Sequence, residues 1–403
     1  MNTAISCQVW VMPETACLEP SRRTILSIFG TRPEAIKMAP VVQRLRADPD
    51  LCHFLVVTGQ HREMLDQALQ LFRLESDVDL KIMQARQSLA QITTRSLSGL
   101  DRLLARKKPD LVLVHGDTTT TLAGALAAAY HQVPIGHVEA GLRSFDRNNP
   151  FPEEINRLLT DQLTTLHFAP TIGARRNLRR EGIPANRILV TGNTAVDALL
   201  GLAPRLTSMP LPAPLSPQRP FLLVEVHRRE NWGEPLRQIG QALADIARHY
   251  PGIDLALSLH KNPIVRASLL PVLSGLDNIH LFEPFTLLDF LSLLQKCYFA
   301  VTDSGGIQEE APSFHRPVLV TRRVTERPEG VKAGVVRVIG ASRAGVRRAC
   351  QRLLDDQDSY RRMTLAANPF GDGHASRRIH AAIRRFFSLP AETVAEFLPG
   401  SVK

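Results

Sequence analysis

The sequence predicts an α/β protein made of two doubly wound, Rossmann-like domains. Short apolar runs rich in Val, Ile, Leu and Phe recur along the chain, and each is followed by a stretch with helical periodicity. Strands of this kind that alternate with helices are typical of parallel sheets covered on both faces. The length of 403 residues exceeds that of one ordinary domain, and a proline-rich segment separates the runs into two series.

The expected strands and boundaries follow from these runs. The first series is 25–30, 54–59, 111–116, 135–140, 166–171 and 188–193, and the second is 221–227, 254–260, 279–284, 299–305, 318–323 and 336–340. Residues 206–220 contain five prolines, which predicts a stiff, non-helical linker. We therefore expect a disordered N-terminal extension at 1–23, domains at 24–205 and 221–370, and a C-terminal helix and tail at 371–403 that pack back on the first domain.

Composition favours a small, negatively charged ligand. The net charge is +10 and the pI is about 9.8, which suits an acidic partner. The charge is spread along the chain with no run of five basic residues, and aromatic residues make up only 5%. The basic and aromatic interleaving of nucleic-acid-binding proteins is missing. A phosphorylated small molecule is therefore expected, and no nucleic acid.

Cysteine usage and hydropathy indicate a cytoplasmic protein. The five cysteines have no CxxC spacing and form no zinc-binding pattern with histidine, so free, mostly buried thiols in a reducing compartment are expected. No apolar run reaches the ~18 residues that span a bilayer, and residues 1–23 lack the features of a signal peptide. We expect no membrane partner.

Polar residues stand where the expected strands end. Ligands of open α/β sheets bind at the carboxyl ends of the strands. The residues in question are Gly30, Arg32, Glu34, Lys37, Asp117, Glu139, His227, Arg228, Arg229, His260, Ser304, Gly305, Gly306, Gln308, Glu310 and Arg327.

These residue types suit a nucleotide diphosphate. Glycines in "DSGGIQEE" (303–310) let a diphosphate approach backbone N–H groups at a helix start, and Arg32, Arg229 and Arg327 can neutralise phosphates. Glu310, one turn into that helix, can bind ribose hydroxyls.

Three carboxylates, Asp117, Glu139 and Glu153, suit acid–base chemistry. Crowding of like charges is expected to raise the pKa of at least one of them, which would supply a general base and a general acid. Lys37 and His227 are further candidates for proton transfer or charge stabilisation.

Each feature also fits a structural role. Asp117 could cap the next helix, the histidines could be satisfied structural residues, the glycines could form a turn, and Arg32 with Lys37 could lie on a solvated helix face. Arginines crowd the acidic loop, so no metal is implied. No GxGxxG follows the first strand, so NAD is not supported.

The chain resembles the bacterial non-hydrolysing UDP-N-acetylglucosamine 2-epimerases from about Ile25 to about Ile379. The matching blocks are "FGTRPEAIKMAP" (29–40), "TGQHREMLDQ" (58–67), "VHGDTTTTLAGALAA" (114–128), "GHVEAGLRS" (136–144), "PFPEEINR" (150–157), "TGNTAVDAL" (191–199), "HRREN" (227–231), "DSGGIQEEAPS" (303–313), "TERPEG" (325–330) and "NPFGDGHAS" (368–376).

The resemblance implies a GT-B fold, in which the two domains face each other across a substrate cleft, and a homodimer. It implies conversion of UDP-GlcNAc to UDP-ManNAc through loss of UDP and the C2 proton, a 2-acetamidoglucal intermediate and re-addition of UDP, for surface polysaccharide synthesis. It implies no cofactor and no metal. The implied catalytic residues are Asp117, Glu139, Glu153 and His227. The implied substrate contacts are Arg32, Lys37, Arg157, Arg229, Phe290, Ser304, Gly305, Gly306, Glu310 and Arg327.

The chain departs from the family pattern in two blocks. Glu225 and Val226 precede His227 where the family commonly has Thr and a small residue, and Lys261 follows His260 where the family commonly has Leu. Many members bind a second UDP-GlcNAc as an activator. By the resemblance, Gln60, His61 and His260 would form that allosteric site, and Glu225 with Lys261 change the charge near it.

Three other functions remain open from the sequence. A hydrolysing relative would release UDP and ManNAc, although the complete blocks at 30–40 and 58–67 favour the non-hydrolysing branch. A GT-B glycosyltransferase would use the same UDP site but has no need of three carboxylates beside the sugar. A nucleotide-sugar sensor would have no activity to lose on mutation of Asp117 or Glu139. The sequence does not say which carboxylate removes the C2 proton.

Overall fold

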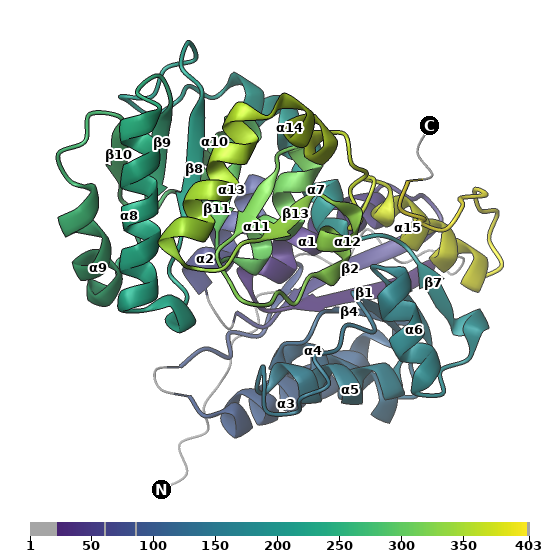
Figure 1. Cartoon of the computed structure of the whole chain (residues 1–403). Helices are drawn as coiled ribbons and strands as arrows, with labels where there is room; N and C mark the ends of the chain where they lie inside the picture. The colour runs from purple at the N-terminus through teal and green to yellow at the C-terminus, as the bar shows by residue number, and fades with distance from the viewer. Residues whose placement is uncertain (1–21, 60–61, 85–86, 401–403) are drawn as a thin grey trace, which may run out of the picture. The chain divides into compact units, whose positions relative to one another are not determined.

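The computed structural model describes residues 22–59, 62–84 and 87–400, and it divides into two compact units. Unit 1 comprises the chain up to Ala198 together with Gly371–Leu398, and unit 2 comprises Leu199–Phe370 with the residues after Leu398. Each unit is built on a parallel sheet (Figure 1). Most of the extension predicted at 1–23 lies outside the described residues, and Arg23 is already the first residue of a strand.

The sheet of unit 1 has seven described strands in the order β3-β2-β1-β4-β5-β6-β7. They are β1 (Arg23–Phe29), β2 (Leu51–Val57), β3 (Val78–Asp79), β4 (Leu111–His115), β5 (Ile135–Val138), β6 (Leu166–Ala169) and β7 (Ile188–Val190). All six strands predicted for this part of the chain are present. β3 was missed because its two residues are too few to show a pattern.

Helices pack along both faces of this sheet. On one face α4 lies between α3 and α5, and on the other α1 contacts both α2 and the C-terminal helix α15. The helices are α1 (Arg32–Arg46), α2 (Arg62–Leu71), α3 (Leu89–Lys107), α4 (Thr119–Tyr130), α5 (Glu153–Leu163), α6 (Ile172–Arg180), the 3-10 turn η1 (Ala185–Arg187) and α15 (Ala375–Phe386). Leu26, Ile28, Val112 and Val114 of the central strands are fully buried beneath them.

The sheet of unit 2 repeats the same winding, in the order β10-β9-β8-β11-β12-β13. Its strands are β8 (Phe221–Glu225), β9 (Asp254–Ser258), β10 (Ile279–Phe282), β11 (Ala300–Thr302), β12 (Val318–Val320) and β13 (Val336–Val338). Its helices are η2 (Arg229–Asn231), α8 (Glu234–His249), α9 (Pro263–Leu273), α10 (Leu287–Lys296), α11 (Gly305–Glu310), η3 (Ala311–Phe314), α12 (Pro328–Ala333), α13 (Arg343–Asp355) and α14 (Gln357–Thr364).

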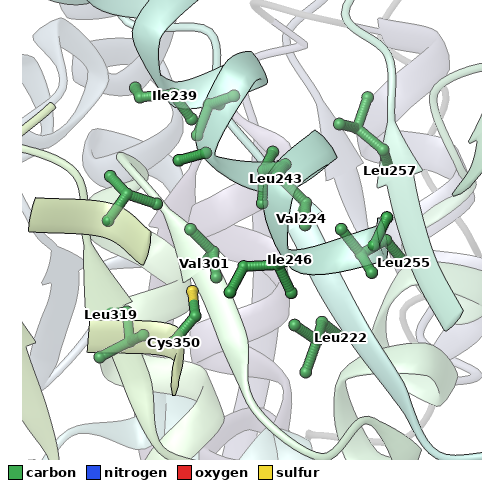
Figure 2. Packing of buried hydrophobic residues seen from close by; sticks show 14 of the residues in the cluster. Leu222, Val224, Ile239, Leu243, Ile246, Leu255, Leu257, Val301, Leu319 and Cys350 are labelled. Carbon is green, nitrogen blue, oxygen red and sulfur yellow. The ribbon is translucent and has the colours of Figure 1, made fainter. Parts of the chain in front are cut away.

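The core of unit 2 forms between its sheet and α8. Figure 2 shows Leu222 and Val224 of β8 and Val301 of β11 packed with Leu243 and Ile246 of α8, and all five are almost completely buried. The winding places a topological switch point between β8 and β11 in this unit, and between β1 and β4 in unit 1. Ligands of doubly wound sheets bind at such points.

Helix α7 (Thr194–Ser208) extends three residues into the segment that was predicted to be a non-helical linker. Leu206 in its last turn is fully buried, and its carbonyl oxygen accepts a hydrogen bond from the Ser292 hydroxyl (3.2 Å). Burial of this side chain therefore outweighs the proline signal of the sequence. From Met209 to Pro220 the chain has neither helix nor strand.

One of the three described cysteines departs from expectation, and Cys7 and Cys17 lie outside the described residues. Cys297 and Cys350 are free and buried, whereas Cys52 is disulfide-bonded, which corrects the prediction of free thiols for that residue. No helix in the described part of the chain is both long and apolar enough to cross a membrane.

Candidate functional site

The loop after β1 is held by Glu34, which lies in the first turn of α1 and is buried. Its Oε2 accepts hydrogen bonds from the backbone N–H groups of Gly30 (3.0 Å) and Thr31 (2.8 Å), as in a capping box. Its Oε1 accepts from the hydroxyls of Thr118 (2.8 Å) and Thr121 (3.1 Å) at the start of α4. Glu34 therefore joins the starts of two helices on either side of the switch point, which is a structural role.

Glu139 directly follows β5 and lies in a polar cluster with Lys37, which like Glu139 is half-buried, and with the buried His115. Its Oε2 is 2.6 Å from Lys37 Nζ and 3.3 Å from His115 Nε2. Its backbone has a φ of 70°, in the left-handed region that residues other than glycine seldom adopt. Strained backbone of this kind gathers at functional sites, and it supports a functional interpretation of this residue. Lys37 does not lie on a solvated helix face.

The ionisation of Glu139 differs from what the sequence suggested. Burial alone would raise the pKa of Glu139, but the Lys37 ammonium and the His115 ring outweigh burial and hold the pKa well below its usual range. The rise in pKa that was predicted for at least one of the three carboxylates does not occur at Glu139. Glu139 is an ionised carboxylate at neutral pH.

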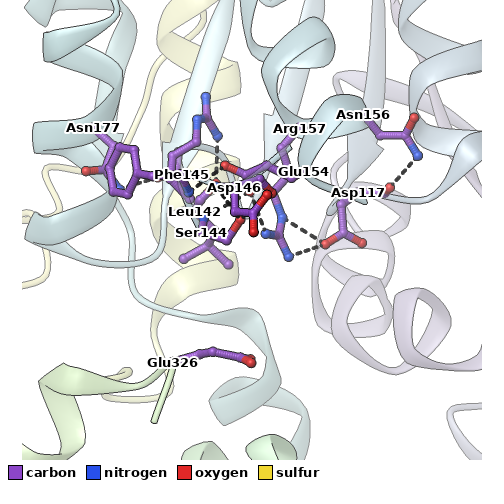
Figure 3. A network of polar contacts seen from close by, with 12 residues as sticks. Asp117, Leu142, Ser144, Phe145, Asp146, Glu154, Asn156, Arg157, Asn177 and Glu326 are labelled. Carbon is purple, nitrogen blue, oxygen red and sulfur yellow. Dashed lines mark hydrogen bonds and ion pairs between the residues drawn. The ribbon is translucent and has the colours of Figure 1, made fainter. Parts of the chain in front are cut away.

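Asp117 follows β4, the neighbour of β5, and is paired with Arg157 of α5 (Figure 3). Its Oδ2 accepts from Arg157 Nε (2.9 Å) and from a terminal guanidinium nitrogen (2.6 Å), and its backbone carbonyl accepts from the Asn156 amide (2.8 Å). The cap of α4 is Thr118, whose hydroxyl accepts from the N–H of Thr121. Asp117 is thus not the helix cap that the sequence left open.

Glu153 and Glu154 at the start of α5 have different roles. Glu154 is buried and accepts hydrogen bonds from the backbone N–H groups of Ser144 and Phe145 (both 3.0 Å) and from Arg157 (3.1 Å). Glu153 is half-buried, and no hydrogen bond or ion pair of its carboxylate occurs within the described residues. Arg157 thus pairs with Glu154, three residues before it on the helix.

A buried cluster of charged residues stabilises the loop that follows β5. Asp161 of α5 accepts from His137 Nδ1 (2.6 Å), from an Arg143 guanidinium nitrogen (2.6 Å) and from the backbone N–H of Gly141 (3.1 Å). The other ring nitrogen of His137 contacts the carbonyl of Gly116, next to Asp117 (2.8 Å). The cluster therefore fixes the turns that present Asp117 and Glu139.

In unit 2 the loop 227–231 is held by Asp303, which follows β11 and is fully buried. The Asp303 carboxylate accepts from the backbone N–H groups of His227 (3.0 Å) and Arg228 (3.0 Å) and from the Asn231 amide (2.8 Å). The Trp232 indole N–H donates to the carbonyl of His227 (3.0 Å). The backbone of His227 is therefore fixed on both sides, and no sequence pattern indicated that Asp303 holds it.

The side chain of His227 lies between a carboxylate and a second imidazole. Its Nδ1 is 3.0 Å from Glu225 Oε1, and its ring stacks on that of His260 with centroids 5.0 Å apart and an interplanar angle of 16°. Contact with the Glu225 carboxylate raises the pKa of His227, against the effect of burial. His227 and His260, far apart in sequence, thus form one cluster.

Ser304, Gly305 and Gly306 begin α11 at the switch point of unit 2. A Cβ added at Gly305 or Gly306 would meet only ordinary contacts of 3.6 Å or more, so the surroundings leave space over both residues. Arg327, which directly precedes α12, forms an ion pair with Glu309 of α11. Glu310, which the sequence assigned to ribose, is half-buried.

The two arginines after His227 are placed differently. Arg229, predicted to bind phosphate, is exposed, and its guanidinium lies 5.5 Å from the centroid of the Trp232 ring. Arg228 is half-buried and points to Gly305, since a Cβ added there would lie 3.6 Å from its guanidinium. Arg228 is thus the better placed of the two for an anion at the start of α11. Phe290 lies in α10 and is half-buried.

The predicted allosteric residues and Arg32 differ in whether the structure describes them. Gln60 and His61, predicted to be allosteric, lie outside the described residues. Arg32 is the first residue of α1 and is half-buried. Across the part of the chain that the structure describes, no three His, Cys, Asp or Glu side chains gather in an arrangement that could hold a metal ion.

Several residues of the site were missed by sequence reasoning. His115 was missed because it is the last residue of a buried strand and looked like part of the sheet. Glu154 was missed because it is next to Glu153 and has the same side chain, so the sequence could not distinguish their roles. Glu225 was noted as a departure, but its contact with His227 was not foreseen.

Comparison with known proteins identifies the family. A family model described as UDP-N-acetylglucosamine 2-epimerase matches residues 43–384. The UDP-N-acetylglucosamine 2-epimerase of Salmonella typhimurium is 50% identical over 370 residues, which cover 90% of this chain and 98% of the relative. The enzyme of the same name from Bacillus subtilis is 48% identical over 355 residues, covering 88% and 93%.

Solved structures agree with these relatives. The crystal structure of UDP-GlcNAc 2-epimerase from Neisseria meningitidis bound to UDP-GlcNAc has a TM-score of 0.79 and 43% identity, and the match covers 90% of this chain and all of that one (100%). The two Rossmann-like units are therefore those of a GT-B-like fold. The chain belongs to the UDP-N-acetylglucosamine 2-epimerase family.

Proposed function

We propose that this protein interconverts UDP-GlcNAc and UDP-ManNAc without hydrolysis, by elimination of UDP and its re-addition. The observation that carries the proposal is the pair of carboxylates at the ends of the neighbouring strands β4 and β5. Asp117 and Glu139 are each held by a cation, Arg157 and Lys37. Family membership and the UDP-GlcNAc bound to the Neisseria relative support the choice of substrate.

The reaction needs a base that removes the C2 proton, UDP as the leaving group, and re-addition of UDP to the intermediate. A carboxylate takes the C2 proton, and the electron pair of the C–H bond forms the C1–C2 double bond as the C1–oxygen bond to UDP breaks. The products are 2-acetamidoglucal and the UDP anion. UDP then adds to C1, and a proton is delivered to the opposite face of C2, which inverts that centre.

In unit 1 we assign acid–base chemistry to Asp117, Glu139 and Glu153, and substrate contacts to Arg32, Lys37 and Arg157. Because Glu139 is ionised, it enters the reaction as a base or as a fixed negative charge, and it is not the proton donor in that state.

In unit 2 we assign the nucleotide to the residues around the β8–β11 switch point. His227 would stabilise the negative charge of the departing UDP, and the start of α11 would bind its phosphates through Ser304, Gly305 and Gly306. Arg228 supplies positive charge beside Gly305. Phe290, Glu310, Arg229 and Arg327 complete the proposed UDP contacts.

Incubation with UDP-GlcNAc in heavy water tests this function. We expect proton NMR to show UDP-ManNAc carrying deuterium at C2, because the proton removed from C2 exchanges with solvent before the reverse step. Accumulation of free UDP and free ManNAc would instead establish hydrolysis. A reaction that starts only on addition of a sugar acceptor would establish a glycosyltransferase.

A further inference from the structure

Glu225 is a carboxylate beside the proposed site to which no role has been assigned so far. It is the last residue of β8, and its side chain is partly exposed, at 22%. Its Oε1 lies 3.0 Å from Nδ1 of His227, two residues further along the chain. The His227 side chain is likewise partly exposed, at 29%, so one edge of the ring is open to a ligand.

The ring of His227 depends on Glu225 for its orientation. The backbone of His227 is fixed by Asp303 and Trp232, and this leaves only the side-chain torsions free. Asp303 is not the partner of the ring, because its nearest oxygen is 4.0 Å from Nδ1 and both oxygens already accept from backbone N–H groups. Glu225 is therefore the carboxylate in contact with the ring.

The contact sets the tautomer of His227. A carboxylate oxygen only accepts hydrogen bonds, so the approach of Glu225 to 3.0 Å favours the tautomer with the proton on Nδ1, although the two groups are not aligned for a hydrogen bond in this conformation. The neutral ring then has its lone pair on Nε2, and the protonated ring has an N–H there. In either state Nε2 is the atom presented away from Glu225.

The ring of His260 stacks on the ring of His227. The backbone N–H of Asn262 donates to its Nδ1 (3.1 Å), which places the proton of the neutral ring on Nε2. The two ring centroids are 5.0 Å apart and the rings are nearly parallel, so His260 restricts the plane of the His227 ring. The charged groups that face His227 are Glu225 and Asp303, which favour its protonation, and Arg228, which opposes it.

We propose that Glu225 is a positioning residue that fixes the His227 ring with Nδ1–H toward the carboxylate and Nε2 toward the substrate. The role rests on the proposed function, in which His227 meets the departing UDP. In its protonated state, the His227 ring held by Glu225 presents an Nε2–H that stabilises the UDP oxygen as the C1–oxygen bond breaks. Carboxylates that orient an imidazole serve in this way in other enzymes.

Titration of the His227 ring by NMR tests the pairing without any substrate. The wild type, Glu225→Gln and Glu225→Asp are compared, and the ring signals are assigned by their loss in His227→Gln. In Glu225→Gln we expect the pKa of His227 to fall toward its ordinary value and the neutral ring to become a mixture of tautomers. Glu225→Asp should retain part of both effects, since it keeps the carboxylate.

A matched control removes a different carboxylate from the same loop. Glu230 pairs with Arg322 (2.5 Å), so Glu230→Gln should leave the His227 titration unchanged. An unchanged titration in Glu225→Gln would overturn the pairing, and an equal shift in Glu230→Gln would show that the effect is only the loss of a nearby charge.

Kinetics then test the positioning role. We expect kcat of Glu225→Gln to fall by about tenfold or more at a pH between the His227 pKa values that NMR measures in the variant and in the wild type, with KM little changed. Lowering the pH should restore kcat, because His227 then regains its proton. A shifted titration with unchanged kcat and pH profile would overturn the positioning role. If the wild type itself does not epimerise, the proposed function fails, and the NMR result on Glu225 still stands.

Discussion

Replacing Glu139 by glutamine is expected to lower kcat by about 10²–10⁴-fold. The side chain is ionised and contacts Lys37 (2.6 Å) and His115 (3.3 Å), and glutamine keeps its shape while removing the charge. If Glu139 is the base, the amide cannot accept the C2 proton. If it is a fixed charge, the substitution removes the negative charge beside the Lys37 ammonium. Steady-state rates with UDP-GlcNAc measure the effect.

The pH dependence separates Glu139 from other acids. Its pKa is held well below the ordinary range, so it stays ionised from acidic to neutral pH. A fall in wild-type kcat/KM on the acid side of neutrality should therefore come from another group and should persist in Glu139→Gln. Loss of C2 deuterium exchange in recovered UDP-GlcNAc would further assign the base role to Glu139.

A carboxylate in the same loop provides the control. Asp146 is exposed, and within the described residues its carboxylate accepts only a local hydrogen bond, from the backbone N–H of Asn148 (2.9 Å). We expect Asp146→Asn to retain wild-type rates. Circular dichroism and the affinity for UDP show whether Glu139→Gln has kept its fold. A folded Glu139→Gln with kcat within about threefold of wild type would contradict the role proposed for this residue.

The architecture could be predicted from the sequence because it depends on local patterns. All of the predicted strands are present, since each is an apolar run long enough to be recognised. The strand ends were predicted less well. β8 stops at Glu225 and β11 at Thr302, so His227 and Asp303 stand in loops where the prediction had strand. This difference is what frees their side chains and backbone groups for the site.

The partners within the site could not be predicted, because they depend on helix phase and on contacts distant in sequence. Glu153 and Glu154 are identical in type, and only the orientation of α5 turns Glu154 inward. The same holds for the neighbours Arg228 and Arg229. The pair of Lys37 with Glu139 joins residues 102 positions apart and exists only because α1 and β5 are brought together by the sheet.

The largest loss of stability is expected from Asp161→Asn. Asp161 and His137 are fully buried, and the Asp161 carboxylate accepts from His137, Arg143 and the backbone of Gly141. Asparagine has one acceptor oxygen, so its NH2 group would face at least one of these donors, and Arg143 would lose one of its two carboxylate partners. Breaking a buried ion pair in this way costs about 3–5 kcal/mol. We expect the free energy of unfolding at pH 7, from urea denaturation, to fall by that amount.

The pH dependence of this loss has a defined sign. Burial would raise the pKa of Asp161, but His137 and Arg143 outweigh it and lower the pKa from 3.8 to about 2. A carboxyl whose pKa is lower in the folded state stabilises the fold above the unfolded pKa, and this contribution disappears as the pH falls through the folded pKa. The shift corresponds to about 2 kcal/mol at pH 7. The difference between wild type and Asp161→Asn should therefore narrow by about 1 kcal/mol between pH 7 and pH 3.

An exposed ion pair serves as the control that shows whether burial causes the loss of stability in Asp161→Asn. Glu392 forms an ion pair with Arg377 in the same unit, and both side chains are exposed, at 52% and 40%. Solvent screens such a pair, so Glu392→Gln should change stability little at either pH. If Asp161→Asn were no more destabilising than Glu392→Gln, the buried cluster would not be the support of the loop that carries Asp117 and Glu139. If Asp161→Asn is far more destabilising than Glu392→Gln, the buried cluster of Asp161, His137 and Arg143 stabilises the loop that carries Asp117 and Glu139.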